Sequence, residues 1–141
     1  TSLYRRLRPW HNIRMTKTSQ KIFLIEDDKS LANTLTEFLR EQGYEVEQAY
    51  TGKEALRILP TIRPDLILLD IILPELSGLE FLKEIQKKDS EFKDIPVLIL
   101  SNLEGDQKNF EAMGVKIHGY FVKANYSLEE LGKKIKKALN E

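Results

Sequence analysis

After Lys21, short apolar runs alternate five times with segments that have helical periodicity. Alternation of this kind is typical of strand–helix units that build a parallel β-sheet covered by helices. We therefore predict an α/β fold with strands near residues 21–26, 44–49, 65–70, 96–101 and 118–122. The first, third and fourth runs are continuously apolar, which favours central strands buried on both faces. The second run alternates apolar and polar residues, which predicts an edge strand.

The segments between these runs carry the signals of helix starts and ends. Residues 29–42 show an apolar stripe at helical spacing, with Asp28 at the expected N-cap and Gly43 as a stop. Three other helices are predicted to begin at capping-box pairs: Thr51 with Glu54, Ser77 with Glu80, and Ser127 with Glu130. The fourth helix, near residues 104–113, has the least apolar content. We expect it to be the helix that moves most easily.

Length and composition narrow the class of protein. A chain of 141 residues is long enough for one domain with its own core. The absence of cysteine excludes disulfides, thiolate metal sites and cysteine nucleophiles. No apolar stretch approaches the ~18 residues of a membrane span, and the N-terminus lacks the apolar centre of a signal peptide. We expect a soluble, cytoplasmic protein without membrane contact.

Charge is unevenly distributed along the chain. Five of the 22 Lys and Arg residues, but none of the 22 Asp and Glu residues, lie in residues 1–20, so residues 21–141 carry a net charge of −5. A basic arm can bind nucleic acid, but we interpret residues 1–14 as a leader added by cloning, ahead of one domain over residues 15–141. The lysines within 133–137 are interpreted as a solvated helix end that complements the helix dipole. Direct nucleic-acid binding by this domain is not expected.

Chemically active side chains follow four of the five apolar runs. Glu26 and Asp27 end the first run, Asp70 the third, Ser101 the fourth and Lys123 the fifth. The carboxyl ends of parallel strands form the sites of such sheets, so we expect these groups to converge. Converging carboxylates need a cation, and Mg²⁺ prefers a few carboxylates together with phosphate oxygens. The pattern predicts a metal site of Glu26, Asp27 and Asp70.

The same groups suit phosphoryl transfer to a carboxylate. Asp70 would be the nucleophile and would form an acyl phosphate. A Mg²⁺ ion, held by Asp27 and Asp70 with Glu26 on a bound water, would offset the repulsion between Asp70 and an anionic phosphoryl group. Lys123 would hold one phosphoryl oxygen by its charge and Ser101 another by a hydrogen bond. Catalysis would then be mostly placement and charge neutralisation.

Four segments resemble motifs of response-regulator receiver domains from two-component signalling systems. They are the acidic strand end 21–28, the phosphoacceptor segment 70–78, and the hydroxyl and lysine strands 95–101 and 119–123. The resemblance implies a single flavodoxin-like doubly wound domain with a parallel sheet of order 2-1-3-4-5. It implies a phosphoryl group taken from the phosphohistidine of a sensor histidine kinase or phosphotransfer protein, lost by slow self-hydrolysis, and read out as a change of shape.

The resemblance also assigns further roles. The backbone carbonyl of Ile72 would be another Mg²⁺ ligand, and Tyr120 would be an aromatic switch that turns inward when Ser101 moves onto the phosphate. The family usually follows its lysine with a cis proline, whereas Ala124 follows Lys123 here. That bond is either trans or held cis by packing. The fourth helix, fifth strand and fifth helix are expected to form the regulated surface, for a downstream target or a homodimer.

Two alternatives remain open from the sequence. A haloacid-dehalogenase-type phosphatase also uses Asp, Ser or Thr, Lys and Mg²⁺, but its nucleophile follows the first strand in an Asp-x-Asp pattern, where this chain has Glu26-Asp27-Asp28. Steady-state phosphate release would favour that enzyme. The other alternative is an interaction module that is never phosphorylated. A receiver domain would not be a multiple-turnover enzyme, because it labels itself once.

Overall fold

The computed structural model describes residues 19–102 and 107–140. The predicted leader at residues 1–14 and Met15 lie outside the described residues, as do residues 104–106 of the predicted fourth helix.

Five parallel strands form one sheet in the order β2-β1-β3-β4-β5. Their bounds are β1 Lys21–Ile25, β2 Glu45–Ala49, β3 Leu66–Leu69, β4 Val97–Ser101 and β5 Gly119–Val122. This order confirms the doubly wound α/β fold. It also confirms that the alternating run 44–49 is an edge strand and that the three continuously apolar runs are central.

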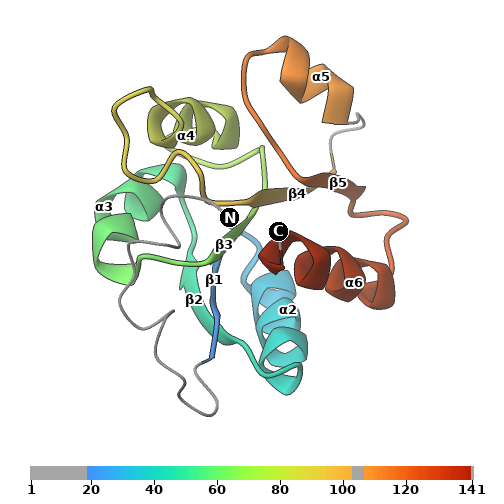
Figure 1. Ribbon diagram of the computed structural model, residues 1–141. Helices are drawn as coiled ribbons and strands as arrows, with labels where there is room; N and C mark the ends of the chain where they lie inside the picture. Colours follow the sequence, from blue (N-terminus) through green and yellow to red (C-terminus); the bar gives the residue numbers. More distant parts are fainter. Residues whose placement is uncertain (1–18, 103–106, 141) are drawn as a thin grey trace.

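Helices cover both faces of the sheet (Figure 1). Their bounds are α2 Lys29–Glu41, α3 Gly52–Ile62, α4 Gly78–Ile85, α5 Gln107–Ala112 and α6 Leu128–Leu139. Alternate side chains of β1, β3 and β4 point to opposite faces, as the period of two in a strand requires. One set packs with α3, α4 and Phe110 of α5, and the other packs with α2 and α6. The sheet therefore lies between two separate apolar cores.

The helices begin where the capping residues predict. The Asp28 carboxylate accepts a hydrogen bond from the Leu31 N–H at 3.1 Å, which confirms Asp28 as the N-cap of α2. Thr51, Ser77 and Ser127 cap α3, α4 and α6 in the same way. These bonds satisfy backbone donors that would otherwise lack partners at a helix start.

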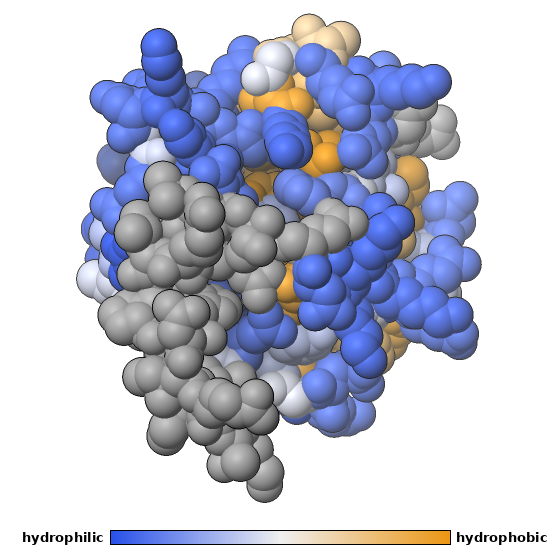
Figure 2. Space-filling model, in the orientation of Figure 1, coloured by the Kyte–Doolittle hydropathy of each residue, from blue (hydrophilic) through white to orange (hydrophobic). Residues whose placement is uncertain are grey.

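Helix α5, which corresponds to the predicted fourth helix, is weakly anchored. It has six residues, of which only Phe110 is buried. Met113, directly after it, leaves 49% of its surface exposed. Figure 2 shows a mostly hydrophilic face on which apolar side chains are visible between α4 and α5. The apolar content of this helix is therefore only partly covered, and its expected mobility stays a prediction.

The structure also bears on the Lys123–Ala124 peptide bond and on membrane-spanning helices. The structure contains no cis peptide bond among the described residues, so the bond between Lys123 and Ala124 is trans. Within residues 19–102 and 107–140, no helix combines the length and apolar character needed to cross a bilayer.

Candidate functional site

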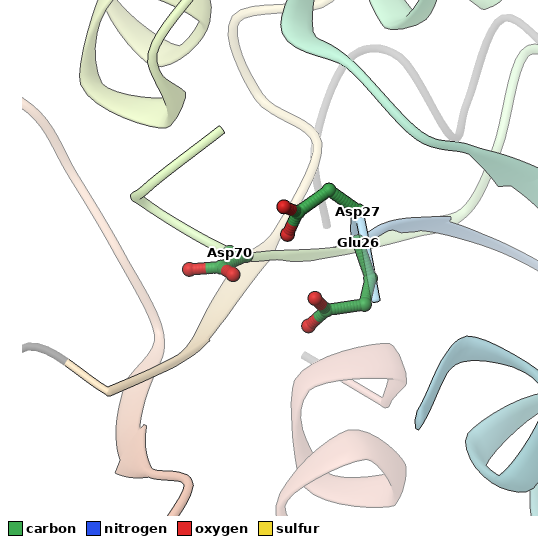
Figure 3. Close-up of side chains that lie close together, drawn as sticks. All are labelled: Glu26, Asp27 and Asp70. Atoms are coloured by element: carbon green, nitrogen blue, oxygen red, sulfur yellow. The ribbon is translucent and has the colours of Figure 1, made fainter. Parts of the chain in front are cut away.

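Three carboxylates meet at the carboxyl edge of the sheet. Glu26 and Asp27 directly follow β1, and Asp70 directly follows β3, which is paired with β1. One carboxylate oxygen from each residue lies within 4.8 Å of the others. Figure 3 shows the three carboxylates turned toward a common space. The predicted convergence of these acids is present in the structure.

The three acids differ in exposure and in their fixed partners. Glu26 and Asp70 are buried, whereas Asp27 is exposed. One Asp70 oxygen, Oδ1, accepts the Ile72 N–H at 3.0 Å. The Glu26 Oε2 atom accepts the Asp28 N–H at 3.0 Å. Backbone donors therefore orient the two buried carboxylates, while Asp27 stays open to solvent and to a ligand.

Lys123 connects the two buried acids. Its Nζ lies 2.7 Å from Glu26 Oε1 and 2.9 Å from Asp70 Oδ2. Its backbone N–H donates to the Ser101 carbonyl at 2.9 Å, which holds the end of β5 against the end of β4. The ammonium offsets part of the negative charge of the cluster. The Lys123 ammonium therefore reaches Asp70 although the bond from Lys123 to Ala124 is trans.

Burial and charge shift the proton affinities of this cluster. Burial raises the pKa of Glu26 to about 7, against the hydrogen bonds from Lys123 and the Asp28 N–H. Burial lowers the pKa of Lys123, but its hydrogen bonds to Glu26 and Asp70 outweigh this and leave the pKa above its ordinary value. Lys123 therefore stays cationic near neutral pH, whereas Glu26 takes up a proton at a higher pH than an ordinary glutamate does.

Ser101 and Tyr120 lie beside the acids, on β4 and β5. Ser101 is fully buried. Burial raises the pKa of the Tyr120 hydroxyl, the Asp70 charge raises it further, and a hydrogen bond with Ser101 offsets part of the increase. Tyr120 also packs against the apolar core under α3, α4 and α5. The tyrosine is therefore placed between the candidate phosphoacceptor and α5.

Ile72 contributes its backbone to the site. Its N–H orients Asp70, and its side chain is 57% exposed, an unusual position for a large apolar group. The predicted role of its carbonyl as a metal ligand stays a prediction. Sequence reasoning missed Tyr126, a half-buried residue whose hydroxyl pKa is raised by burial and responds to the charges of Lys123 and Glu26. No motif in the sequence marks Tyr126, because its place depends on how the loop after β5 folds.

A family model for the response regulator receiver domain matches residues 22–136. The chain belongs to the response-regulator receiver family. Apart from Lys21 at the start of β1, the match covers the five strands, and it includes the acids, the serine and the lysine of the site. It confirms the resemblance drawn from the motifs.

Two bacterial transcriptional regulatory proteins are similar to most of the chain. YcbL of Bacillus subtilis, an uncharacterized transcriptional regulatory protein, is 35% identical over 82% of this chain and 49% of its own length. The transcriptional regulatory protein CrdR of Helicobacter pylori is 37% identical over 86% of this chain and 56% of its own length. The chain thus spans about half the length of these curated relatives.

Solved receiver structures have the same fold. The receiver domain of the Francisella response regulator 1452 matches with a TM-score of 0.76 at 29% identity, covering 86% of this chain and 98% of that one. The chemotaxis response regulator CheY4 of Vibrio cholerae matches with a TM-score of 0.75 at 30% identity, covering 86% of this chain and 99% of that one. This receiver domain therefore has the same fold as the solved response-regulator receiver domains.

Proposed function

We propose that this receiver domain takes a phosphoryl group onto Asp70 from the phosphohistidine of a histidine kinase or phosphotransfer protein. An Asp70 carboxylate oxygen forms the bond to phosphorus while the bond from phosphorus to the donor nitrogen breaks, and the imidazole leaves and takes a proton from solvent. The observation that carries the proposal is the convergence of three carboxylates with Lys123 between the two buried ones. Simple structural roles for these residues would not require them to meet.

The donor set fits Mg²⁺. Hard oxygen ligands on a partly open site match the ion, which usually keeps several waters and binds one or two carboxylates and a phosphate. Asp27, Asp70 and the Ile72 carbonyl would hold it, and Glu26 would hold one of its waters. When bound, the ion would neutralise charge between the carboxylate and the phosphoryl oxygens.

The protein groups then divide the remaining work. The Ile72 N–H holds Asp70 Oδ1 in place, so the carboxylate is oriented before the donor arrives. Lys123 is already at Asp70 and supplies a charge for a phosphoryl oxygen. The Ser101 hydroxyl, at the end of β4, supplies a hydrogen bond to another. Each molecule would accept one phosphoryl group and lose it by slow hydrolysis, so the domain would not turn over as an enzyme.

Tyr120 would transmit the effect of phosphorylation from the site to α5. The hydrogen bond between Tyr120 and Ser101 changes when Ser101 turns to a phosphoryl oxygen, and the ring then repacks against α5. We propose α5, β5 and α6 as the surface that a downstream protein or a second copy reads. Amide exchange with and without beryllofluoride checks this, and equal protection of these elements in both states would reject it. We also propose a cytoplasmic location, because the proposed partner kinase would use ATP.

Labelling with acetyl phosphate tests the central proposal. Wild-type protein with Mg²⁺ should gain the mass of one phosphoryl group, and the gain should disappear in Asp70→Asn and without Mg²⁺. Continuous phosphate release at a steady rate would instead favour the phosphatase alternative, which the family match already disfavours. Absence of any label on the wild type would favour the interaction module.

A further inference from the structure

A surface recess of about 680 Å³ lies beside the site, where α2, the start of α3 and the loop after β3 meet. Three basic side chains line it, namely Lys29, Lys53 and Arg57, together with Tyr50. Lys53 and Arg57 are exposed and four residues apart on α3, so they share one helix face. The Lys29 ammonium lies 5.3 Å from the centre of the Tyr50 ring. The recess is thus a concave surface with three cations around it.

These cations have no acidic partner within the described part of the chain. Among the described residues, 19–102 and 107–140, no ion pair includes Lys29, Lys53 or Arg57. Two carboxylates also border the recess. One of them, Glu54, is committed to the helix start, where its Oε1 accepts the Tyr50 N–H at 2.8 Å. The other is Glu75, so the three basic side chains outnumber the remaining carboxylate by two.

The recess borders the loop that follows the phosphoacceptor. The Leu76 carbonyl packs so closely on Gly52 that a Cβ there would overlap the carbonyl oxygen. This contact presses the loop between β3 and α4 onto the first turn of α3, which carries Lys53. The same loop begins at Asp70, whose Oδ1 is held by the Ile72 N–H. A molecule seated in the recess would therefore contact both α3 and the Asp70 loop.

We propose that this recess docks an acidic segment of the phosphodonor protein. The inference rests on the proposed function, because a protein that delivers a phosphoryl group to Asp70 must cover this edge of the sheet. Most of the domain repels such a segment, since residues 21–141 carry a net charge of −5. The recess is where acidic side chains find unpaired cations next to the site. Charge complementarity of this kind directs encounter and orientation more than it adds affinity.

Two synthetic peptides test the proposal, each with one histidine, flanked by glutamates in one and by glutamines in the other. The first measurement uses the unphosphorylated peptides at low salt and without Mg²⁺. The glutamate peptide should shift the NMR amide signals of Lys29 and residues 50–57 of the protein, and the glutamine peptide should not. Lys53→Gln/Arg57→Gln should weaken this binding about tenfold, since two exposed ion pairs are removed. The matched control Lys136→Gln/Lys137→Gln changes charge equally on an exposed part of α6 and should bind as the wild type does.

Phosphotransfer separates this inference from the function on which it rests. The phosphohistidine form of the glutamate peptide should label wild-type protein faster than the glutamine form, and the recess variant should lose that advantage. Acetyl phosphate, which needs no docking, should label the wild type and both variants equally. Equal binding of the two peptides, or binding unchanged in the recess variant, would overturn the docking role. Failure of acetyl phosphate on the wild type would overturn the proposed function, while the NMR result would still decide whether the recess binds acidic peptide.

Discussion

The Tyr120 ring of β5 packs against the Phe110 ring of α5, with centroids 5.3 Å apart and planes tilted by 33°. On its other side, Tyr120 shares a hydrogen bond with Ser101 and is affected by the charge of Asp70. One aromatic side chain therefore joins the candidate phosphoacceptor to the described helix that has the fewest buried residues. Any change at the site that moves Tyr120 therefore acts on α5, whose only buried side chain is Phe110.

Replacing Phe110 with alanine should release α5 locally. Loss of a buried phenylalanine costs about 3–5 kcal/mol in a core, and here the loss falls on a six-residue helix with no other buried side chain. We expect faster amide exchange in residues 107–112, while β1 and β3 stay protected. Met113→Ala, which truncates a half-exposed neighbour, should leave exchange unchanged. Equal acceleration in the central strands would show that α5 is not an independent unit.

Stability should depend on pH through Glu26. Its pKa rises from an ordinary 4.5 to about 7 in the folded state, so the folded state holds the proton more tightly than the unfolded state does. The stabilisation is therefore full below pH 4.5 and is lost as the pH rises through 7. Without Mg²⁺, the wild type should lose about 2–3 kcal/mol from this group between pH 5 and pH 8. Urea unfolding of the wild type and Glu26→Gln at both pH values measures the difference, and parallel pH profiles would contradict it.

Asp27 and Asp28 are neighbours with different roles, and substitution should separate them. Asp28→Ala removes an N-cap and should cost about 1 kcal/mol of stability, with Mg²⁺ affinity almost unchanged. Asp27→Asn removes a proposed ligand and should weaken Mg²⁺ binding at least tenfold, the range seen even for outer partners of ligands. Calorimetric titration measures both affinities. The assignment fails if Asp28→Ala loses Mg²⁺ binding and Asp27→Asn keeps it.

Adding a methyl group at Gly52 should be costly. A Cβ at this position meets the Leu76 backbone, which cannot turn away as a side chain can. Gly52→Ala should therefore lower stability by about 1–3 kcal/mol and slow the labelling of Asp70, because the displaced loop carries Ile72. Gly132→Ala is the matched control, since its nearest neighbour is the Phe38 ring at 3.3 Å. A neutral Gly52→Ala would show that the loop is not pinned to α3.

Local signals account for the parts of the structure that the sequence predicts well. The strands lie within one residue of the predicted runs, because a central strand needs an unbroken apolar stretch and an edge strand an alternating one. The helices begin at Asp28, Thr51, Ser77 and Ser127, because each side chain caps a backbone donor three residues on. The convergence of Glu26, Asp27 and Asp70 also follows once the strands are parallel, since all three come directly after strand ends.

Contacts between distant segments account for what the sequence does not reveal. The Leu76 carbonyl meets Gly52 across 24 positions of the chain, and no periodicity marks either residue. Tyr126 approaches Glu26 because of the path taken by a loop. The raised pKa of Glu26 requires knowing how completely that side chain is buried. Such quantities depend on the assembled sheet edge rather than on any one segment.

The sheet separates the two apolar cores. This separation determines which helices a movement at the site would reach. Tyr120 faces the side that holds α3, α4 and α5, while its neighbour Phe121 faces the side that holds α2 and α6. A rotation of Tyr120 would therefore disturb the core that packs with α3, α4 and α5. The core that packs with α2 and α6 would stay in place. Asymmetry of this kind gives a small domain both a moving part and a fixed frame.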